Sequence, residues 1–287
     1  MKEYEITFKS CNSANYPKRI TAYIVEPGKI DKNTGMMHFA HGWGGNRYQY
    51  QEMQREFANR YNLICVATEY RQSGYDFDAI TGRGACLPYD FSHLQVIDCL
   101  NTLRKTLEIY PRVNKKRIIS FGGSQGGHIS MLMAIFAPNT FCLAISGSAI
   151  SHIDSKWRLR AGRNFSEDEL AVRNVVKMAS LIQCPVVLMH GTRDENVSEN
   201  HTHLLEEALL SAKKRVRVKY YKGAGHMLEP VTNRQKATIE LANDLLKNAL
   251  NNKRIDFKAK SKIVIHCPTK NFVIDWSKRT DAYDLVK

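Results

Sequence analysis

The fold class is indicated most clearly by residues 117–136, RIISFGGSQGGHISMLMAIF. This stretch begins with a short apolar run typical of a buried strand, and it ends with a mostly apolar segment long enough for a helix. Between them lies GGSQG at 122–126, which fits the pattern G-x-S-x-G. A turn this tight would make side chains on either side of the serine clash, and glycine removes that clash. The pattern therefore predicts that Ser124 presents an exposed hydroxyl at the end of a strand.

Strands and helices alternate on both sides of this stretch. Strands are predicted at 4–10 and at 19–27, the second with alternating apolar and polar residues. Short apolar strands are predicted at 36–40, 63–68, 117–121, 141–146 and 185–190, and helices at 48–60, 90–110, 125–137, 200–212 and 233–250. Asp90 is expected to cap the second of these helices. Continuous apolar strands alternating with helices predict an α/β fold whose mostly parallel central sheet is covered by helices on both faces.

Two segments depart from the alternation. Residues 151–179 are mostly polar, and we expect them to form a small cap insertion near the site, within a main domain of residues 1–250. Residues 251–287 contain KIVIHC and NFVIDW around a Pro-Thr turn. They predict a C-terminal extension that folds as a β-hairpin.

The chain is basic, with 42 Lys and Arg against 28 Asp and Glu and a formal net charge of +14. Basic residues gather at 213–222, where they alternate with apolar ones, and again after residue 252. The alternation predicts a strand with one solvated face. No nucleic-acid-binding motif accompanies it, so we expect no specific nucleic-acid partner.

The seven cysteines are scattered and include no C-x-x-C pair. We therefore expect no metal site and no cofactor. The N-terminus MKEYEITFKS lacks the apolar stretch of a signal peptide, and no run of about 18 apolar residues suggests a membrane span. These features predict a cytoplasmic protein, and they leave its oligomeric state open.

A serine hydroxyl becomes a strong nucleophile only when a neighbouring base takes its proton, and that base must be oriented by an acceptor. After a strand–serine–helix turn of this type, the acid and the histidine follow in chain order, each in a loop after a later strand. Asp194 follows the strand at 185–190, and His226 follows the basic strand through Gly-Ala-Gly. We predict Ser124 as nucleophile, His226 as general base and Asp194 as the acid that orients it.

Other acids and histidines compete for these roles. Glu195 is the neighbouring acid, and Asp154 follows the preceding strand. His190 lies in the strand before the acid, and we expect it to brace the acid loop. His201 and His203 could form a metal pair, but a solvent-facing helix start is the preferred interpretation.

Acyl transfer also needs hydrogen-bond donors aimed at the developing oxyanion. One donor is the backbone N–H of the residue after the nucleophile, Gln125. The other is expected from HGWGG at 41–45, where glycines let the backbone approach a substrate closely. We predict the N–H of Trp43 as this donor; the alternative is that Trp43 only lines the pocket.

Three motifs together resemble the α/β-hydrolases of the prolyl-oligopeptidase and acetyl-esterase branch. PVVLMHGTRDENV at 185–197 is similar to the acid-loop pattern P-x-L-x-x-H-G-x-x-D-x-x-V of that branch. FGGSQGG at 121–127 resembles the nucleophile elbow, the sharp strand-to-helix turn that carries the catalytic serine, of acetyl xylan esterases and cephalosporin deacetylases. GAGHMLE at 223–229 resembles the loop that carries the catalytic histidine in the same branch. The likeness covers about residues 20–250.

The resemblance implies the same triad of Ser124, Asp194 and His226, with Trp43 and Gln125 as oxyanion donors. Two positions differ from the deacetylases. Their Arg-Gly-Gln motif is replaced by YRQSG at 70–74, and the glutamate that follows their catalytic histidine is replaced by methionine.

The sequence therefore predicts a cofactor-free serine hydrolase that cleaves small acyl or acetyl esters through an acyl-enzyme. Two alternatives stay open: a serine peptidase of the prolyl-oligopeptidase type acting on short peptides or acyl-amino acids, and a catalytically silent hydrolase fold that serves as a binding module. Arg158, Arg160 and Arg163 in the predicted cap suggest an acidic or polar substrate group, with a solvated basic face as the other interpretation.

The loop after the strand at 63–68 is expected to contribute to the substrate pocket. Its candidate pocket residues are Tyr70, Arg71 and Tyr75.

Overall fold

The computed structural model describes residues 1–10, 18–74 and 89–287. In this part of the chain, eight strands form one sheet in the order β1-β2-β4-β3-β5-β6-β7-β8. The strands are β1 (Glu3–Ser10), β2 (Lys18–Val25), β3 (Gly35–Ala40), β4 (Leu63–Glu69), β5 (Ile118–Gly123), β6 (Leu143–Gly147), β7 (Val186–Gly191) and β8 (Val216–Tyr221). β2 is antiparallel to both of its neighbours, and all pairs from β4 to β8 are parallel. The predicted mostly parallel sheet is confirmed.

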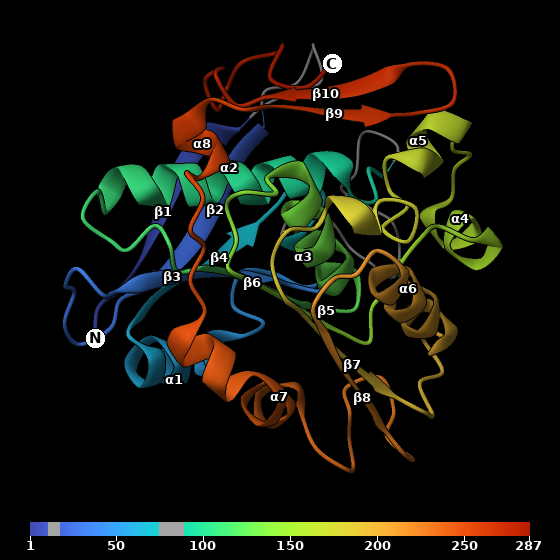
Figure 1. Cartoon of the computed structure of the whole chain (residues 1–287), viewed down its shortest axis with the longest axis horizontal. Coiled ribbons are helices and arrows are strands. Elements are labelled where there is room, and N and C mark those ends of the chain that lie inside the picture. Colours follow the sequence, from blue (N-terminus) through green and yellow to red (C-terminus); the bar gives the residue numbers. More distant parts are fainter. Residues whose placement is uncertain (11–17, 75–88) are drawn as a thin grey trace.

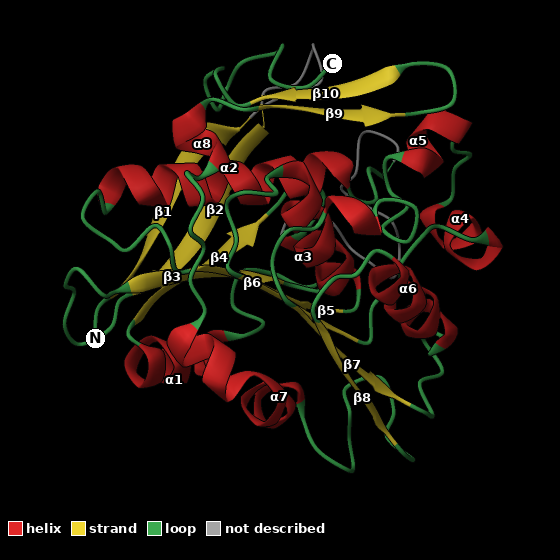
Figure 2. Ribbon diagram, in the orientation of Figure 1, coloured by secondary structure: helices red, strands yellow, loops and turns green. Residues whose placement is uncertain are grey.

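Helices cover both faces of this sheet (Figures 1 and 2). They are α1 (Gln51–Tyr61) and α7 (Arg234–Asn248) on one face, and α2 (His93–Ile109), α3 (Gln125–Phe136) and α6 (Asn200–Ser211) on the other. Successive side chains of β3 point to opposite faces of the sheet: Met36 packs with α2 and α3, and Met37 packs with α1 and α7. Two hydrophobic clusters therefore enclose the sheet.

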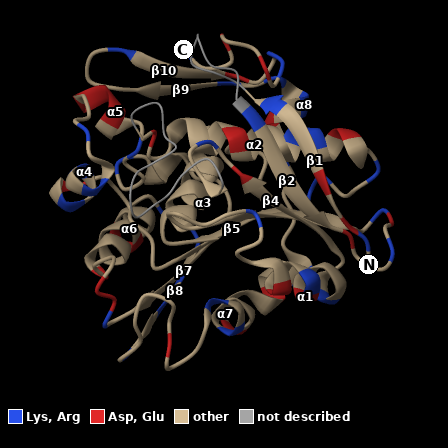
Figure 3. Ribbon diagram, turned by 180° about the vertical axis from the view of Figure 1, so that it is seen from behind, with Lys and Arg blue, Asp and Glu red and all other residues tan. Residues whose placement is uncertain are grey.

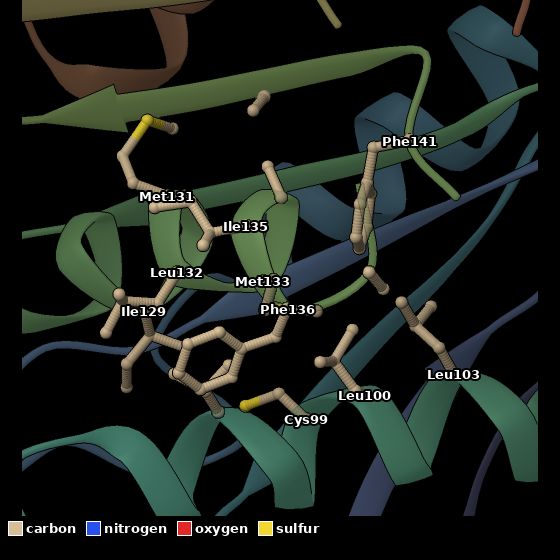
Figure 4. Close-up of a cluster of buried hydrophobic side chains, with 14 of the residues drawn as sticks. Cys99, Leu100, Leu103, Ile129, Met131, Leu132, Met133, Ile135, Phe136 and Phe141 are labelled. Atoms are coloured by element: carbon tan, nitrogen blue, oxygen red, sulfur yellow. The ribbon is translucent and has the colours of Figure 1, made fainter. Parts of the chain in front are cut away.

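The central strands and α3 are fully enclosed. Every residue of β3, β5, β6 and β7 is buried, as is every residue of α3. Figure 4 shows Phe136 of α3 facing Cys99 and Leu100 of α2. Burial on all sides explains why these segments are continuous apolar runs in the sequence, without the alternation of a surface strand.

Asp90 caps α2 from a greater distance than predicted. The helix begins only at His93, but the Oδ2 atom of Asp90 accepts hydrogen bonds of 2.9 Å from the backbone N–H groups of Leu94 and Gln95. A carboxylate that accepts from the first turn satisfies donors that have no partner within the helix. The predicted capping residue is confirmed, and the helix start is shifted.

Two short helices, α4 (Ser155–Ala161) and α5 (Glu167–Ala171), occupy the predicted cap segment. Around them a third, smaller apolar cluster is formed by Tyr89, Phe91, Ile150, Ile153, Trp157, Phe165 and Val197. The nearby turn η2 (Ala179–Leu181) leads back to β7. This small cluster holds the cap beside the carboxyl ends of the central strands.

The C-terminal segment forms α8 (Asp256–Ala259) and an antiparallel hairpin of β9 (Lys262–His266) and β10 (Asn271–Asp275), which lies beside α2 (Figure 1). Trp276 is 1% exposed, and its Nε1–H donates to the carbonyl of Phe136 at 2.9 Å. The predicted hairpin is confirmed. The apolar side chains of the hairpin pack in the same core as α2 and α3. The division into a main domain and an extension at residue 250 therefore stays a prediction.

The basic strand β8 is paired with acidic residues of α7. Arg217 contacts both carboxylate oxygens of Asp244, at 2.6 and 2.7 Å, and Lys219 pairs with Glu240. Figure 3 shows that α7 carries residues of both signs. The strand with one solvated face is confirmed, and these two of its charges have partners within the chain.

Among the described helices, none combines the length and apolar character needed to cross a bilayer. The described cysteines are free thiols, and all except the half-buried Cys267 are buried. Cys11 and Cys86 lie outside the described residues.

Three buried histidines predict that the fold loses stability in mild acid. Burial lowers the pKa of His38 to about 3 and the pKa values of His41 and His128 to about 4. The unfolded chain protonates each near pH 6.5, so stability that is complete above this pH is lost as the pH falls toward 4. We expect the free energy of unfolding to fall by about 1.4 kcal/mol per pH unit for each histidine. Urea unfolding followed by circular dichroism at several pH values measures this slope.

Removing one buried histidine provides the control for this prediction. His38→Asn is expected to reduce the slope. A free energy of unfolding that stays constant between about pH 6.5 and pH 5 would contradict the lowered pKa values of these histidines.

Candidate active site

Ser124 lies at the sharp turn between β5 and α3, with φ of 58° and ψ of −129°. A Cβ atom at Gly122 would lie 2.1 Å from the carbonyl oxygen of Gly126, and one at Gly126 would lie 2.0 Å from that of Ala40. Only glycine fits at these two positions. The backbone N–H of Ser124 donates to the carbonyl of Gly147 at 2.8 Å, which fixes the strained turn to β6.

Asp194 and His226 come together from the loops after β7 and β8. The Nδ1 atom of His226 lies 2.7 Å from the Oδ2 atom of Asp194. The carboxylate is fully buried, while the imidazole is 17% exposed. The other carboxylate oxygen accepts hydrogen bonds of 2.9 Å from the backbone N–H groups of Asn196 and Val197. This arrangement orients one ring nitrogen toward a fixed acceptor and leaves the other accessible.

His190 supports the acid from within β7. Its Nε2 atom lies 3.2 Å from Asp194 and 3.0 Å from the carbonyl of Val197, and its Nδ1 atom lies 2.7 Å from the hydroxyl of Thr202. Burial would raise the pKa of Asp194, but hydrogen bonds from His190 and His226 lower that pKa well below its usual range. The carboxylate therefore stays ionised across the physiological range.

The two competing acids are placed differently. Glu195 is exposed, and its carbonyl accepts a hydrogen bond from Lys156. Asp154 caps α4 by accepting from the backbone N–H of Trp157 at 3.1 Å. Neither is the carboxylate bonded to His226.

Ser124 and His226 line one pocket of about 210 Å³. The described residues around it are Gly42, Trp43, Gln49, Ser124, Trp157, Arg160, Asn196, His226, Met227 and Arg234. The loop after β3 reaches the nucleophile, since a Cβ atom at Gly42 would lie 3.5 Å from the Cβ of Ser124. The Trp43 ring packs against Tyr89, with ring centroids 4.3 Å apart. Trp43 is therefore in the wall of the pocket, and the role of its N–H as oxyanion donor stays a prediction.

The side chain of Gln125 is fixed in the same region. Its amide accepts a hydrogen bond of 2.9 Å from the hydroxyl of Tyr89 and donates one of 2.8 Å to Gln95. These contacts hold the first turn of α3 against the first turn of α2 and the loop before it. The backbone N–H of Gln125 remains the predicted first oxyanion donor.

The structure does not bring Tyr70 and Arg71 to this pocket. Tyr70 is 1% exposed, stacks on His41 with ring centroids 4.0 Å apart, and donates to the carbonyl of His41 at 3.0 Å. Arg71 is buried in a double contact of 2.8 Å with both oxygens of Asp98. The Tyr70 hydroxyl and the Arg71 guanidinium are bonded to buried groups, so these residues support the loops beneath the site. Tyr75 lies outside the described residues.

Several pocket residues, above all Arg234, were not predicted from the sequence. Its guanidinium lies over the elbow, since a Cβ atom at Gly123 would be 2.5 Å from the Cζ of Arg234. It also donates to the carbonyl of His226 at 3.0 Å. One signal was present, because Arg234 is the first residue of a helix, where the macrodipole disfavours a cation. A cation at this position does not stabilise the helix, which indicates a role in the pocket.

A second serine, histidine and aspartate meet near the cap. The hydroxyl of Ser151 lies 3.3 Å from the Nδ1 atom of His201. The Nε2 atom of His201 lies 3.5 Å from a carboxylate oxygen of Asp154. The prediction that His201 faces solvent is wrong: it is 5% exposed, because α6 packs this side chain against the segment after β6. Ser151 is only 1% exposed, which makes this group a poor site for a substrate. The described residues contain no group of three or more metal-ligating side chains that could hold an ion.

Comparison with solved structures places this architecture among the α/β-hydrolase folds. An acylaminoacyl peptidase of Pyrococcus horikoshii superimposes with a TM-score of 0.71 at 17% identity, over 88% of this chain and 42% of that one. A putative dipeptidyl aminopeptidase IV of Bacteroides ovatus superimposes with a TM-score of 0.68 at 15% identity, over 87% of this chain and 36% of that one. At these identities the likeness concerns the fold.

The sequence itself assigns the family. The model of the prolyl oligopeptidase family, Peptidase_S9, matches residues 92–253. An uncharacterized peptidase of Bacillus subtilis (strain 168), YtmA, is 32% identical over 158 residues, which are 51% of this chain and 61% of that protein. This chain thus spans less than two thirds of the length of that relative. It belongs to the prolyl oligopeptidase family of serine hydrolases.

Proposed function

We propose that this chain hydrolyses small carboxylic esters, with Ser124 as nucleophile, His226 as general base and Asp194 as the orienting acid. The observation that carries the proposal is one small pocket lined by both Ser124 and His226, with Asp194 bonded to the far side of the imidazole. Nucleophile, base and orienting acid are the groups that acyl transfer requires.

The chemistry follows from the positions of these groups. The Oγ atom of Ser124 attacks the acyl carbon while its proton passes to Nε2 of His226, and Asp194 stabilises the resulting imidazolium. The oxyanion accepts hydrogen bonds from the backbone N–H groups of Trp43 and Gln125. His226 then protonates the leaving alcohol. A water molecule deprotonated by His226 cleaves the acyl-enzyme and releases the acid.

The size of the pocket supports a small acyl group. Its volume of about 210 Å³ lies below the range of about 300–1,000 Å³ common for small-molecule sites. Trp43 and Trp157 form apolar walls, which suit a short hydrocarbon chain.

A second candidate is hydrolysis of short peptides or acyl-amino acids. The family match favours it, and so does the name of the Bacillus subtilis relative, which is called a peptidase. Esters and amides pass through the same acyl-enzyme, so the triad does not distinguish them. The difference lies in the protonation and binding of the leaving group.

Paired chromogenic substrates test the proposal. We expect p-nitrophenyl acetate and butyrate to be turned over with a higher kcat/KM than aminoacyl and N-acetylaminoacyl p-nitroanilides, and the rate to fall as the acyl chain outgrows the pocket. Rates measured with Ser124→Ala give the background for every substrate. Strong turnover of anilides with negligible turnover of esters would replace the esterase proposal with the peptidase one.

A further inference from the structure

Among the described residues, those that line the pocket beside Ser124 include cationic side chains and no carboxylate. Its described lining includes two arginines, Arg160 and Arg234, and two side-chain amides, Gln49 and Asn196, but no carboxylate. Within the described ranges, no Asp or Glu forms an ion pair with either guanidinium. Arg163 of the cap, by contrast, contacts Glu169 at 2.8 Å and the carbonyl of Tyr89 at 2.8 Å.

Arg234 is a buried cation with incomplete hydrogen bonding. It is 4% exposed, its Nη1 donates to the hydroxyl of Tyr50 at 3.3 Å, and its Nη2 donates to the carbonyl of His226 at 3.0 Å. Its Nε has no hydrogen-bond partner within the part of the chain that the structure describes. Removing a charge from water is costly unless an opposite charge or a full set of acceptors replaces the water. The neutral partners of Arg234 supply only part of that compensation.

Arg160 is held in place by aromatic rings. Its guanidinium lies 5.3 Å from the ring centroid of Trp43 and 5.6 Å from that of Trp157. Contacts with two ring faces restrict the side chain before any ligand arrives, which lowers the entropic cost of binding. Arg160 is exposed, so an anion can reach it from solvent.

We infer that the natural substrate carries a negatively charged group, such as a carboxylate, which binds between Arg160 and Arg234 while Ser124 attacks the acyl carbon. This inference rests on the proposed function and specifies its substrate class. Arginine donates several parallel N–H groups to an oxyanion, and such charge-assisted bonds are stronger than neutral ones. The anion would supply the negative charge that the described lining of the pocket lacks.

Matched substrates separate charge from shape. The p-nitrophenyl monoester of adipic acid is compared with the p-nitrophenyl ester of monomethyl adipate, which has the same chain without the charge. A second pair, 3-acetoxybenzoate and its methyl ester, places the charge on the leaving group. We expect a preference of about tenfold or more in kcat/KM for the charged member of at least one pair. This preference should decrease at high ionic strength, because salt screens the arginines.

Variants on one helix show whether the preference comes from the pocket. Arg160→Gln is expected to lower the charged-to-neutral ratio of kcat/KM by about tenfold, and Arg160→Lys to retain part of it. Arg158 is the matched control: it lies two positions earlier on α4, is exposed, and is not among the described residues that line the pocket. We expect Arg158→Gln to leave the ratio unchanged.

Each result is decisive. Equal turnover of charged and neutral members, both dependent on Ser124, would overturn this inference and leave the proposed function intact. An equal loss of preference in Arg158→Gln and Arg160→Gln would also overturn it, because a diffuse basic surface would then explain the effect. If p-nitrophenyl acetate and both pairs all go unhydrolysed, the proposed function fails and the inference fails with it. Turnover of p-nitrophenyl acetate without turnover of either pair would overturn the inference alone.

Discussion

Ser124→Ala is expected to lower kcat/KM for the preferred ester by about 10⁴-fold or more and to abolish labelling by a fluorophosphonate probe. The reason is that the hydroxyl is both the attacking atom and the atom that becomes acylated. Loss of one hydroxyl from a half-buried position creates little void, so the fold should be retained. Initial rates, probe labelling on a gel and the thermal midpoint of unfolding together measure the effect.

Ser151→Ala is the control, because Ser151 also lies beside a histidine that contacts an aspartate. We expect this variant to be labelled like the wild type. Equal labelling of Ser124→Ala and the wild type would show that the nucleophile lies elsewhere. A wild-type chain that takes no label and hydrolyses no substrate would instead support the silent binding module.

Asp194→Asn is expected to reduce kcat by about 10³- to 10⁴-fold. The carboxylate accepts from Nδ1 of His226 at 2.7 Å and would stabilise the positive imidazolium during attack. An amide of the same shape removes that charge and allows the wrong tautomer of the ring. It can still accept from the backbone N–H groups of Asn196 and Val197, so the loop should keep its conformation. Steady-state kinetics across pH and a comparison of thermal unfolding measure the two consequences separately.

The competing acids provide matched controls for this substitution. Glu195→Gln changes an exposed neighbour, and we expect activity within about twofold of the wild type. Asp154→Asn alters the cap of α4 and should affect stability more than the chemical step. Loss of activity in Glu195→Gln, with Asp194→Asn active, would reverse the assignment of the acid.

Family membership and pocket shape constrain different aspects of function. The family match identifies a serine hydrolase, and the fold is shared with peptidases that are much longer than this chain. Substrate choice depends on the walls of the pocket, which come from the cap, from the loops after β3, β7 and β8, and from the start of α7. The two substrate experiments therefore examine leaving group and charge independently.

Several features of this protein follow from local rules of its sequence. Glycines at 122 and 126 are required wherever a strand turns so sharply into a helix, because a Cβ atom at either position meets a carbonyl oxygen. Parallel strands bring their carboxyl ends to one edge, so Asp194 and His226, each just after a strand, could be expected to meet there. Apolar runs likewise predicted which strands are buried.

Other features were decided only by tertiary packing. Tyr70 and Arg71 follow a strand at the same edge of the sheet, yet they turn toward buried partners. Arg160 and Arg234 lie 74 positions apart in sequence, and only the placement of α4 and α7 brings both to one pocket. The physical reason is that strand order and glycine sterics fix where a loop begins, whereas the direction of a side chain depends on which distant element packs against it.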